Sequence, residues 1–328
     1  MNAMQKFLLE FEKEWEYTIN SLGYRQKQLL IGHRLRPQIA FWGYISEIKI
    51  SELDKISYKS IAQVTVSIEL LHKASRILDD ILDNDSERHG ETAFHIEYGE
   101  KLTIIFALHL VGLAAWRLQK IILTKYNESV YGSCLSKILD IIYSMSLGAL
   151  EELRLESFEL YDKMKISTIA KLETAEIIGN SLQIGYIFSN ASNEQVLAIL
   201  KTIGLQCGYL FQTLNDLEAF SNAIHNMEHK GETNFDIDRN RKNIVITMLW
   251  ELASKKDKEI ILHSTGGNIV HIAEKYHLKS FVLNEMEIVF NDMLNIVHTL
   301  SSYGISDEWI IAFSDFLYQL RDIAYRRL

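Results

Sequence analysis

The chain has 328 residues and a formal net charge of -9, from 34 Lys and Arg against 43 Asp and Glu. This acidic balance disfavours a general nucleic-acid-binding protein. One proline and 16 glycines leave few places where strands could end or hairpins could turn, so the composition favours long helices.

The termini and the cysteines indicate the compartment. Cys134 and Cys207 are isolated and lack metal-ligand spacing, which predicts free thiols in a reducing environment. Residues 7–17 are amphipathic and acidic, unlike a signal peptide. No uncharged apolar run approaches the roughly 18 residues that a spanning helix needs. We therefore expect a cytoplasmic protein without a transmembrane segment.

Apolar residues recur at three- and four-residue intervals along almost the whole chain, which predicts helices. The expected helices cover residues 5–20, 33–48, 59–84, 101–125, 128–160, 165–190, 194–224, 239–255, 268–302 and 306–327. No pair of strands is predicted. Several helices are apolar on more than one face, and no Gly-, Ser- or Pro-rich linker divides the chain. The sequence therefore predicts one all-α domain over residues 1–328, a helical bundle with a central cavity.

Three aspartates interrupt the apolar helix expected over residues 59–84. Asp79 and Asp83 are four residues apart and share a face, with roughly 5–6 Å between their Cβ atoms, and Asp80 lies beside them. Such a cluster of oxygens suits Mg²⁺, and Arg88 can donate two hydrogen bonds to a phosphate. The pattern indicates a site for a metal ion and a diphosphate, and a solvated acidic helix end is the alternative.

A second polar break lies at residues 211–220, FQTLNDLEAF, where Gln212, Asn215 and Asp216 interrupt another apolar helix. The longest polar stretch, residues 221–241, follows it directly. A loop of this length in a compact domain is usually functional or disordered.

These segments resemble the motifs of the trans-isoprenyl diphosphate synthases, the polyprenyl synthetase family. The family's Asp-Asp-x-x-Asp followed by Arg-Arg-Gly is matched by Asp79, Asp80, Asp83 and then Arg88, His89 and Gly90. Its second motif, Phe-Gln-x-x-Asp-Asp-x-x-Asp, is matched in part by residues 211–219, and its Gly-Lys-Arg-x-Arg-Pro by GHRLRP at residues 32–37. The resemblance covers about residues 30–245 and implies the all-α isoprenoid synthase type I bundle.

The resemblance implies a Mg²⁺-dependent prenyltransferase that ionises an allylic diphosphate and joins it to isopentenyl diphosphate, giving a polyprenyl diphosphate. Up to three Mg²⁺ ions would be held by Asp79, Asp80, Asp83, Asp216 and Asn215. The residues implied at the allylic diphosphate are Arg88, Thr174 and Arg241, and those implied at isopentenyl diphosphate are His33, Arg36, His72 and His89. Gln212 would face the reacting carbons or the water shell of the metal. A homodimer through long apolar helices is also implied.

Each of these roles has a simpler alternative. His72 could be a core histidine, Arg36 could cap a helix, and Gln212 could satisfy buried carbonyls. Ser75 and Ala74, four and five residues before Asp79, are small, which permits products of farnesyl length or longer.

The chain also departs from the family pattern. His33 and His89 replace family cations by groups that are only partly charged at neutral pH. The other departures are Glu173 in place of a lysine, Asn215 and Ala219 in place of aspartates, and Ala149 and Glu152 in place of Gln and Asp. Lys171 is a candidate to compensate for Glu173.

These departures leave alternatives open. One is a ComQ-like peptide prenyltransferase, which would prenylate a tryptophan of a pheromone precursor peptide. Another is a catalytically weak or regulatory subunit of a heteromeric synthase. A terpene cyclase fits less well, because Ala219 and Ala223 do not complete its metal motif.

Overall fold

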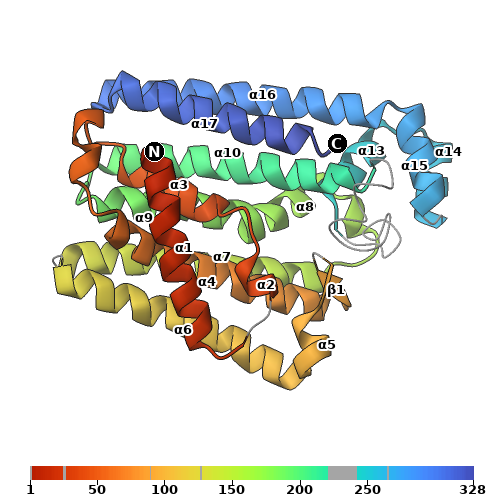
Figure 1. Cartoon of the computed structure of the whole chain (residues 1–328). Coiled ribbons are helices and arrows are strands. Elements are labelled where there is room, and N and C mark those ends of the chain that lie inside the picture. Colours follow the sequence, from red (N-terminus) through yellow and green to blue (C-terminus); the bar gives the residue numbers. More distant parts are fainter. Residues whose placement is uncertain (1, 25–26, 89, 126–127, 221–241, 264–265) are drawn as a thin grey trace.

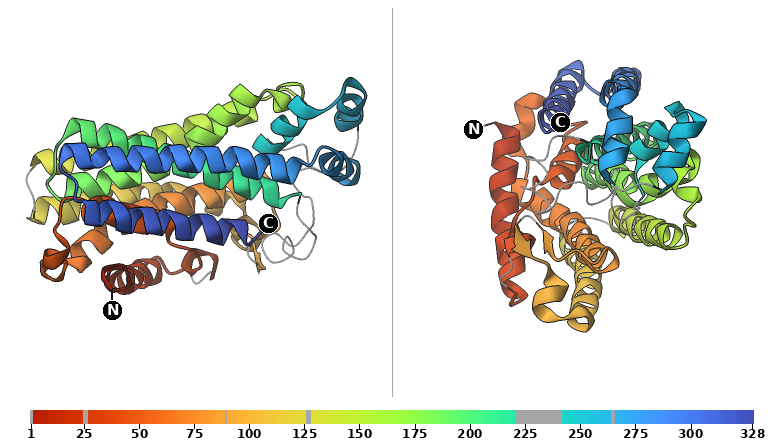
Figure 2. Two further views of the ribbon diagram at one scale, coloured as in Figure 1. Left: turned by 90° about the horizontal axis from the view of Figure 1, so that it is seen from above. Right: turned by 90° about the vertical axis from the view of Figure 1, so that its right-hand side faces the viewer.

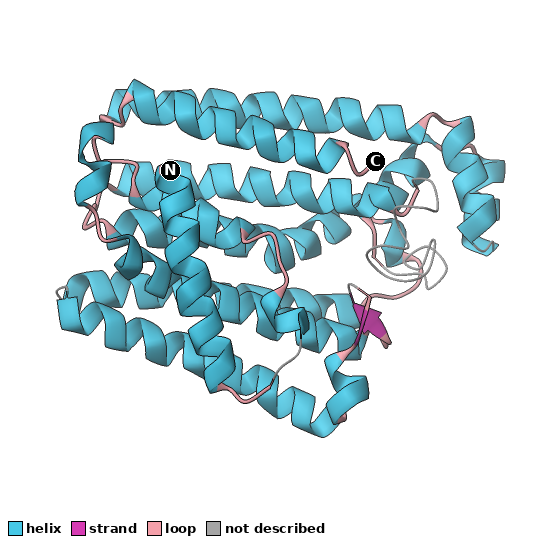
Figure 3. Cartoon of the chain, viewed as in Figure 1, coloured by secondary structure: helices cyan, strands magenta, loops and turns pink. Residues whose placement is uncertain are grey.

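The computed structural model describes residues 2–24, 27–88, 90–125, 128–220, 242–263 and 266–328. These residues are almost entirely helical, which confirms the predicted all-α class (Figures 1 and 3). The first half contains α1 (Ala3–Ser21), α2 (Lys27–Leu30), α3 (Leu35–Tyr44), η1 (Ile50–Lys55), α4 (Tyr58–Leu82), β1 (Glu87–Arg88), β2 (Glu91–Thr92), α5 (Phe94–Tyr98), α6 (Glu100–Lys125) and α7 (Glu128–Leu153). The second half contains η2 (Glu159–Tyr161), α8 (Lys163–Ala170), η3 (Lys171–Ala175), α9 (Glu176–Phe188), α10 (Glu194–Glu218), α13 (Ile244–Leu252), α14 (Lys255–His263), α15 (Gly266–Lys275), α16 (Leu278–Thr299), η4 (Leu300–Tyr303) and α17 (Asp307–Tyr325).

The long helices run side by side around α4, α9 and α10. Helix α4 packs against α1 and α6, α9 packs against α3, α7 and α10, and α10 packs against α16. Figure 2 shows the bundle from above and from one end. The strand β1, the last turn of α10 and the start of α13 all lie at one end of the molecule, on the right in Figure 1. This end carries the polar segments that the sequence singles out.

Helix α4 matches the expected helix over residues 59–84. The side chain of Ser57 accepts a hydrogen bond from the backbone N–H of Ser60 and caps its start. Most of its residues are buried. The helix ends at Leu82 with Asp83 as its C-cap, and the following residue, Asn84, takes a left-handed conformation with φ of 53°.

A short antiparallel hairpin follows α4, which corrects the prediction that the chain contains no strand pair. Glu87 pairs with Thr92 and Arg88 pairs with Glu91. Gly90 takes a φ of 73°, which glycine adopts without strain. The hairpin turns the chain back and holds Arg88 beside the end of α4.

Other expected helices are shorter or broken. The helix predicted over residues 165–190 is divided into α8, the π-helical turn η3 and α9. The helix predicted over residues 268–302 is broken at His277, which has a φ of 51°. Helix α7 ends at Leu153 rather than at residue 160. The sequence did not predict these interruptions because residues 154–160, 171–175 and 274–279 contain no glycine or proline to mark a helix end.

Helices α6 and α7 bear on the expectation that no segment spans a membrane. By length and composition alone, the segments Glu100–Thr124 and Glu128–Leu153 are long and apolar enough to cross a membrane. In the apolar 18-residue stretch of each, 33% and 28% of the residues are buried in the fold. Both helices pack against the bundle, α6 on α4 and α7 on α9, and such helices are weak evidence for a span. The absence of a membrane segment stays a prediction.

Helices α3 and α9 approach each other closely at glycines. A Cβ added to Gly185 would lie 1.8 Å from the carbonyl oxygen of Ala40, which is a backbone atom that cannot turn aside. We expect Gly185→Ala to destabilise the protein by about 2 kcal/mol or more through overpacking. Urea unfolding would measure this change.

Gly112 on α6 provides the matched control, because a Cβ there meets nothing within 4 Å. Alanine in a helix is favoured over glycine, so Gly112→Ala should be neutral or stabilise by up to about 1 kcal/mol. Equal effects of the two substitutions would contradict the packing of α3 on α9.

Candidate active site

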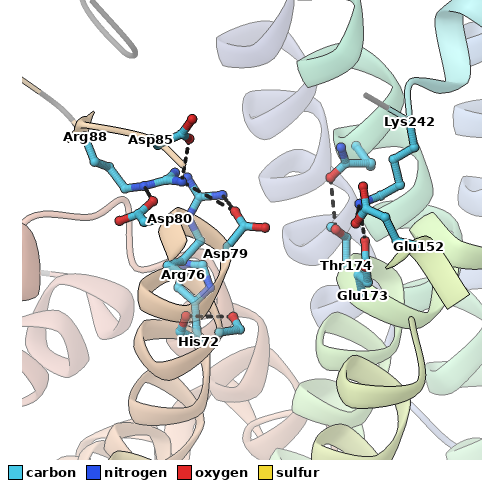
Figure 4. A network of polar contacts seen from close by, with 12 residues as sticks. His72, Arg76, Asp79, Asp80, Asp85, Arg88, Glu152, Glu173, Thr174 and Lys242 are labelled. Carbon is cyan, nitrogen blue, oxygen red and sulfur yellow. Dashed lines mark hydrogen bonds and ion pairs between the residues drawn. The ribbon is translucent and has the colours of Figure 1, made fainter. Parts of the chain in front are cut away.

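The aspartates at the end of α4 are compensated by a buried arginine. The Asp80 carboxylate is 1% exposed, and its Oδ1 accepts a hydrogen bond from Nε of Arg88. Nη2 of Arg88 lies 3.4 Å from Oδ2 of Asp79 and 3.5 Å from Oδ2 of Asp85. One guanidinium, itself 6% exposed, thus contacts three carboxylates (Figure 4).

The three predicted metal ligands of α4 differ in accessibility. Asp79 is 40% exposed and its arginine contacts are long, 3.4 Å to Arg88 and 3.5 Å to Nη1 of Arg76. Asp83 is half-buried at the end of the helix. Asp80 is enclosed, and burial raises the pKa of its carboxyl while the charge of Arg76 lowers it. Asp79 and Asp83 are therefore the carboxylates best placed to meet a ligand.

The residues predicted at isopentenyl diphosphate are only partly brought together. Burial lowers the pKa of Arg36 to about 10, and the Nε atom of this residue is buried without a hydrogen-bond partner. The pKa of His72 lies well below 6.5, because of burial first and the charge of Arg36 next, so His72 is neutral at pH 7. His33 is exposed and its Nε2 lies 2.8 Å from Nη2 of Arg327 near the C-terminus. Arg36 is thus the permanent cation of this group.

The other arginine of the GHRLRP segment has a structural role. Arg34 is 6% exposed, and it pairs with Glu12 at 2.8 Å and with Glu69 at 3.1 Å. These contacts join the N-terminal helix to α4. Two further predicted site residues, His89 and Arg241, lie outside the described residues.

The second polar break forms a hydrogen-bond chain from η3 to α13. Oγ1 of Thr174 donates to Oε1 of Gln212 at 2.9 Å, and Nε2 of Gln212 donates to Oδ1 of Asp216 at 2.7 Å. The other carboxylate oxygen, Oδ2, accepts from the backbone N–H of Ile244 at 2.7 Å. Asp216 is 5% exposed, whereas Asn215 is exposed. The aspartate of this motif therefore holds the start of α13.

Glu173 is compensated by Lys242 rather than by Lys171. Nζ of Lys242 lies 2.7 Å from Oε2 of Glu173 and also pairs with Glu152. Lys171 is exposed. Burial, together with repulsion from Glu152, raises the pKa of Glu173 to about 8, and the two carboxylates raise that of Lys242. Figure 4 shows this cluster opposite the aspartates of α4.

The aspartates of α4 fit Mg²⁺ better than the residues at the end of α10 do. Asp79 and Asp83 supply oxygens that a hard cation prefers. In contrast, both carboxylate oxygens of Asp216 already accept hydrogen bonds, and Asn215 offers only a neutral amide. Among the residues that the structure describes, no group of three or more His, Cys, Asp or Glu side chains is arranged to hold a metal ion. The donor set favours metal binding on the α4 side.

Sequence reasoning missed three contributors. Arg76 precedes Asp79 by three residues, so helical spacing could have placed it at the site. Asp85 follows Asp83 by two residues, so its closeness in the sequence was a signal as well. Lys242 lies 69 residues after Glu173, and no local signal joins the two.

The pKa of Glu173 leads to a pH prediction. Its value in the folded protein is about 8, against 4.5 ordinarily, so folding takes up a proton at Glu173 between these pH values. The stability that this residue contributes therefore falls as the pH rises through that window. The free energy of unfolding of Glu173→Gln, measured with urea, should therefore increase relative to that of the wild type as the pH rises from 5 to 8.

Lys242→Met should show the opposite trend, because it leaves Glu173 without a cation when this residue ionises at the higher pH. Glu251→Gln is the control, since Glu251 forms a surface pair with Lys163 and should change stability by less than about 0.5 kcal/mol at both pH values. Parallel pH profiles for all three variants would refute the proposed coupling.

Comparisons with known proteins agree with the fold. The polyprenyl synthetase family model matches residues 25–279. A farnesyl diphosphate synthase from Buchnera aphidicola is 28% identical over 302 residues, which cover 85% of this chain and 96% of that protein. The crystal structure of a geranylgeranyl pyrophosphate synthase superposes with a TM-score of 0.80 at 18% identity and covers 98% of both chains.

A geranylgeranyl pyrophosphate synthase from Corynebacterium glutamicum, solved with isoprenyl diphosphate and magnesium, superposes with a TM-score of 0.76 at 19% identity. It is covered over 96% of its length by 99% of this chain. The two crystal structures confirm the predicted all-α isoprenoid synthase bundle. Since the family model spans more than half of the chain, the protein belongs to the polyprenyl synthetase family and is a prenyltransferase.

Proposed function

We propose that the protein is an isoprenyl diphosphate synthase that requires Mg²⁺ and joins an allylic diphosphate to isopentenyl diphosphate. The observation that carries this proposal is the end of α4, where the accessible carboxylate of Asp79 lies beside the guanidinium group of Arg88 and Asp83 follows one helical turn later. Carboxylates that hold a divalent cation, next to arginines, suit a diphosphate.

In this proposal Asp79 and Asp83 hold Mg²⁺, which supplies positive charge that stabilises the departing diphosphate. Arg88 positions the carboxylates and adds charge beside them. Thr174 and Gln212 fix the opposite wall through their hydrogen bond. Arg36 binds the acceptor, and the neutral His72 can accept or donate one hydrogen bond there.

The alternatives receive less support. The relatives described above are diphosphate synthases, so nothing favours a precursor peptide as the acceptor. A regulatory role has one supporting observation, the engagement of Asp216 in the start of α13. We also propose a cytoplasmic location, because Cys134 and Cys207 are buried free thiols, as in proteins of reducing compartments.

Activity tests the proposal directly. With farnesyl diphosphate, labelled isopentenyl diphosphate and Mg²⁺, the purified protein should form an elongated diphosphate. Asp79→Asn and Asp83→Asn should each lower kcat/KM by about 100-fold or more, because transition-state charge stabilisation is lost. Asp140→Asn is the control, since Asp140 lies in a surface pair with Lys137. If the wild type forms no elongated product, the synthase proposal is wrong and the regulatory role is favoured. If Asp79→Asn and Asp83→Asn leave kcat/KM unchanged, the metal assignment is wrong.

We further propose a homodimer whose interface lies on α6 and α7. These adjacent helices expose large apolar side chains at helical spacing: Ile105, Leu108 and Trp116 on α6, and Leu139, Tyr143 and Leu150 on α7, each 49–67% exposed. An apolar face of this kind marks an interaction site in soluble proteins. A second copy of the chain would bury it.

Sedimentation equilibrium should therefore give about twice the chain mass of 37.9 kDa. The double variant Leu108→Glu, Tyr143→Glu should sediment as a monomer, because burial of two charges in an apolar interface is costly. Ile288→Glu on α16 is the control, since Ile288 is 58% exposed but lies on another helix. A monomeric wild type would disprove the dimer.

A further inference from the structure

Arg76 is a cation that the motifs of the chain do not include. It lies on α4, three and four residues before Asp79 and Asp80 and four residues after His72, so it shares their face of the helix. Figure 4 shows its side chain between His72 and Asp79. It is 39% exposed, and its ion pair with Asp79 is long, at 3.5 Å.

Arg76 lies between the aspartates at the end of α4 and a second group of cations around Arg36. Its charge lowers the pKa of both Arg36 and His72, so the two guanidinium groups lie close enough to repel each other. Glu69 is the acid that acts on Arg36, and it is already paired with Arg34. Two neighbouring arginines, one with a long pair to Asp79 and the other beside a glutamate already paired with Arg34, make a site for an anion.

The position of the pair favours one of the two substrates. Arg88 is enclosed by Asp79, Asp80 and Asp85, and it belongs to the side where the metal-bound diphosphate is proposed. Arg76 lies one helical turn away, toward His72 and Arg36. Because His33 is turned to Arg327 and His72 is neutral, this second side needs another permanent cation to hold a diphosphate.

We propose that Arg76 binds the diphosphate of the acceptor, isopentenyl diphosphate, together with Arg36. This inference rests on the proposed function. It makes Arg76 a determinant of acceptor affinity that takes the place of fixed charge absent from His33. The planar guanidinium can donate two hydrogen bonds to a phosphate group, and a lysine would supply the charge without that geometry.

Steady-state kinetics and equilibrium binding test this proposal together. Arg76→Gln should raise the KM for isopentenyl diphosphate about tenfold or more, and change the KM for farnesyl diphosphate by less than about twofold. Arg76→Lys should recover part of the acceptor affinity. Calorimetric titration of isopentenyl diphosphate with EDTA present should show the same order of affinities without turnover.

Lys59→Gln is the matched control, because Lys59 lies on the same helix, is 64% exposed and has one long pair with Glu14. It should leave both KM values unchanged. Unfolding curves of Arg76→Gln and Arg76→Lys would show whether both variants are folded. If Arg76→Gln does not fold, the KM values of Arg76→Lys provide the test.

The two proposals fail in different ways. If the wild type elongates farnesyl diphosphate and neither variant weakens the acceptor, the role of Arg76 is wrong and the synthase function stands. A larger effect on the KM for farnesyl diphosphate would equally overturn it. If the wild type shows no elongation but binds isopentenyl diphosphate through Arg76, the anion site stands and the synthase function fails.

Discussion

The structure of the site depends on how the carboxylates at the end of α4 are compensated. Asp80 and Asp85 are 1% and 5% exposed, and burial of ionised groups without partners would cost several kcal/mol each. Arg88 resolves this because it contacts both of them and Asp79 as well. Its position requires the sharp reversal that β1 and β2 provide, so a two-residue strand pair determines which aspartates remain accessible. Since Asp80 is tied to Arg88, Asp79 and Asp83 are left to meet a ligand.

The side of the site opposite α4, formed by η3, α7 and the start of α13, must also compensate a buried carboxyl group. Glu173 comes from a π-helical turn that brings it against Gly148 of α7, where a Cβ would lie 2.4 Å from its Cγ. Its charge is balanced by Lys242, which is held in place because Asp216 fixes the backbone at Ile244. The aspartate that could have bound metal thus serves to place a cation. The loss of carboxylates in the second motif and the presence of Glu173 are therefore linked through the start of α13.

The fold was predictable where local patterns decide it. Apolar spacing located α4 and α10, since each buries a continuous stripe against several neighbours. Helical geometry alone predicts that Asp79 and Asp83 share one face of α4. Arg88 follows Asp83 by five residues in the sequence, so its proximity was also predictable. The contact of Lys242 with Glu173 was not predictable, because 69 residues separate them and the partner is fixed only by tertiary packing. The π-helical turn η3 was not predictable either, since residues 171–175 contain no breaker residue and the turn packs closely against Gly148 of α7.

The Lys242 side and the α3–α4 side of the site differ in net charge, and this difference determines which side can hold the diphosphates. The wall of Lys242 sets one ammonium against two acidic side chains, of which Glu173 is protonated below a pKa of about 8, so it has no net positive charge to offer an anion. The wall of α3 and α4 carries Arg36, Arg76 and Arg88 against the aspartates, and a divalent cation at Asp79 and Asp83 would make its net charge positive. Both diphosphates would then be held mainly from one side of the bundle. The reacting carbons would project from that side toward Gln212 and Thr174, whose hydrogen bond keeps the facing wall neutral and fixed.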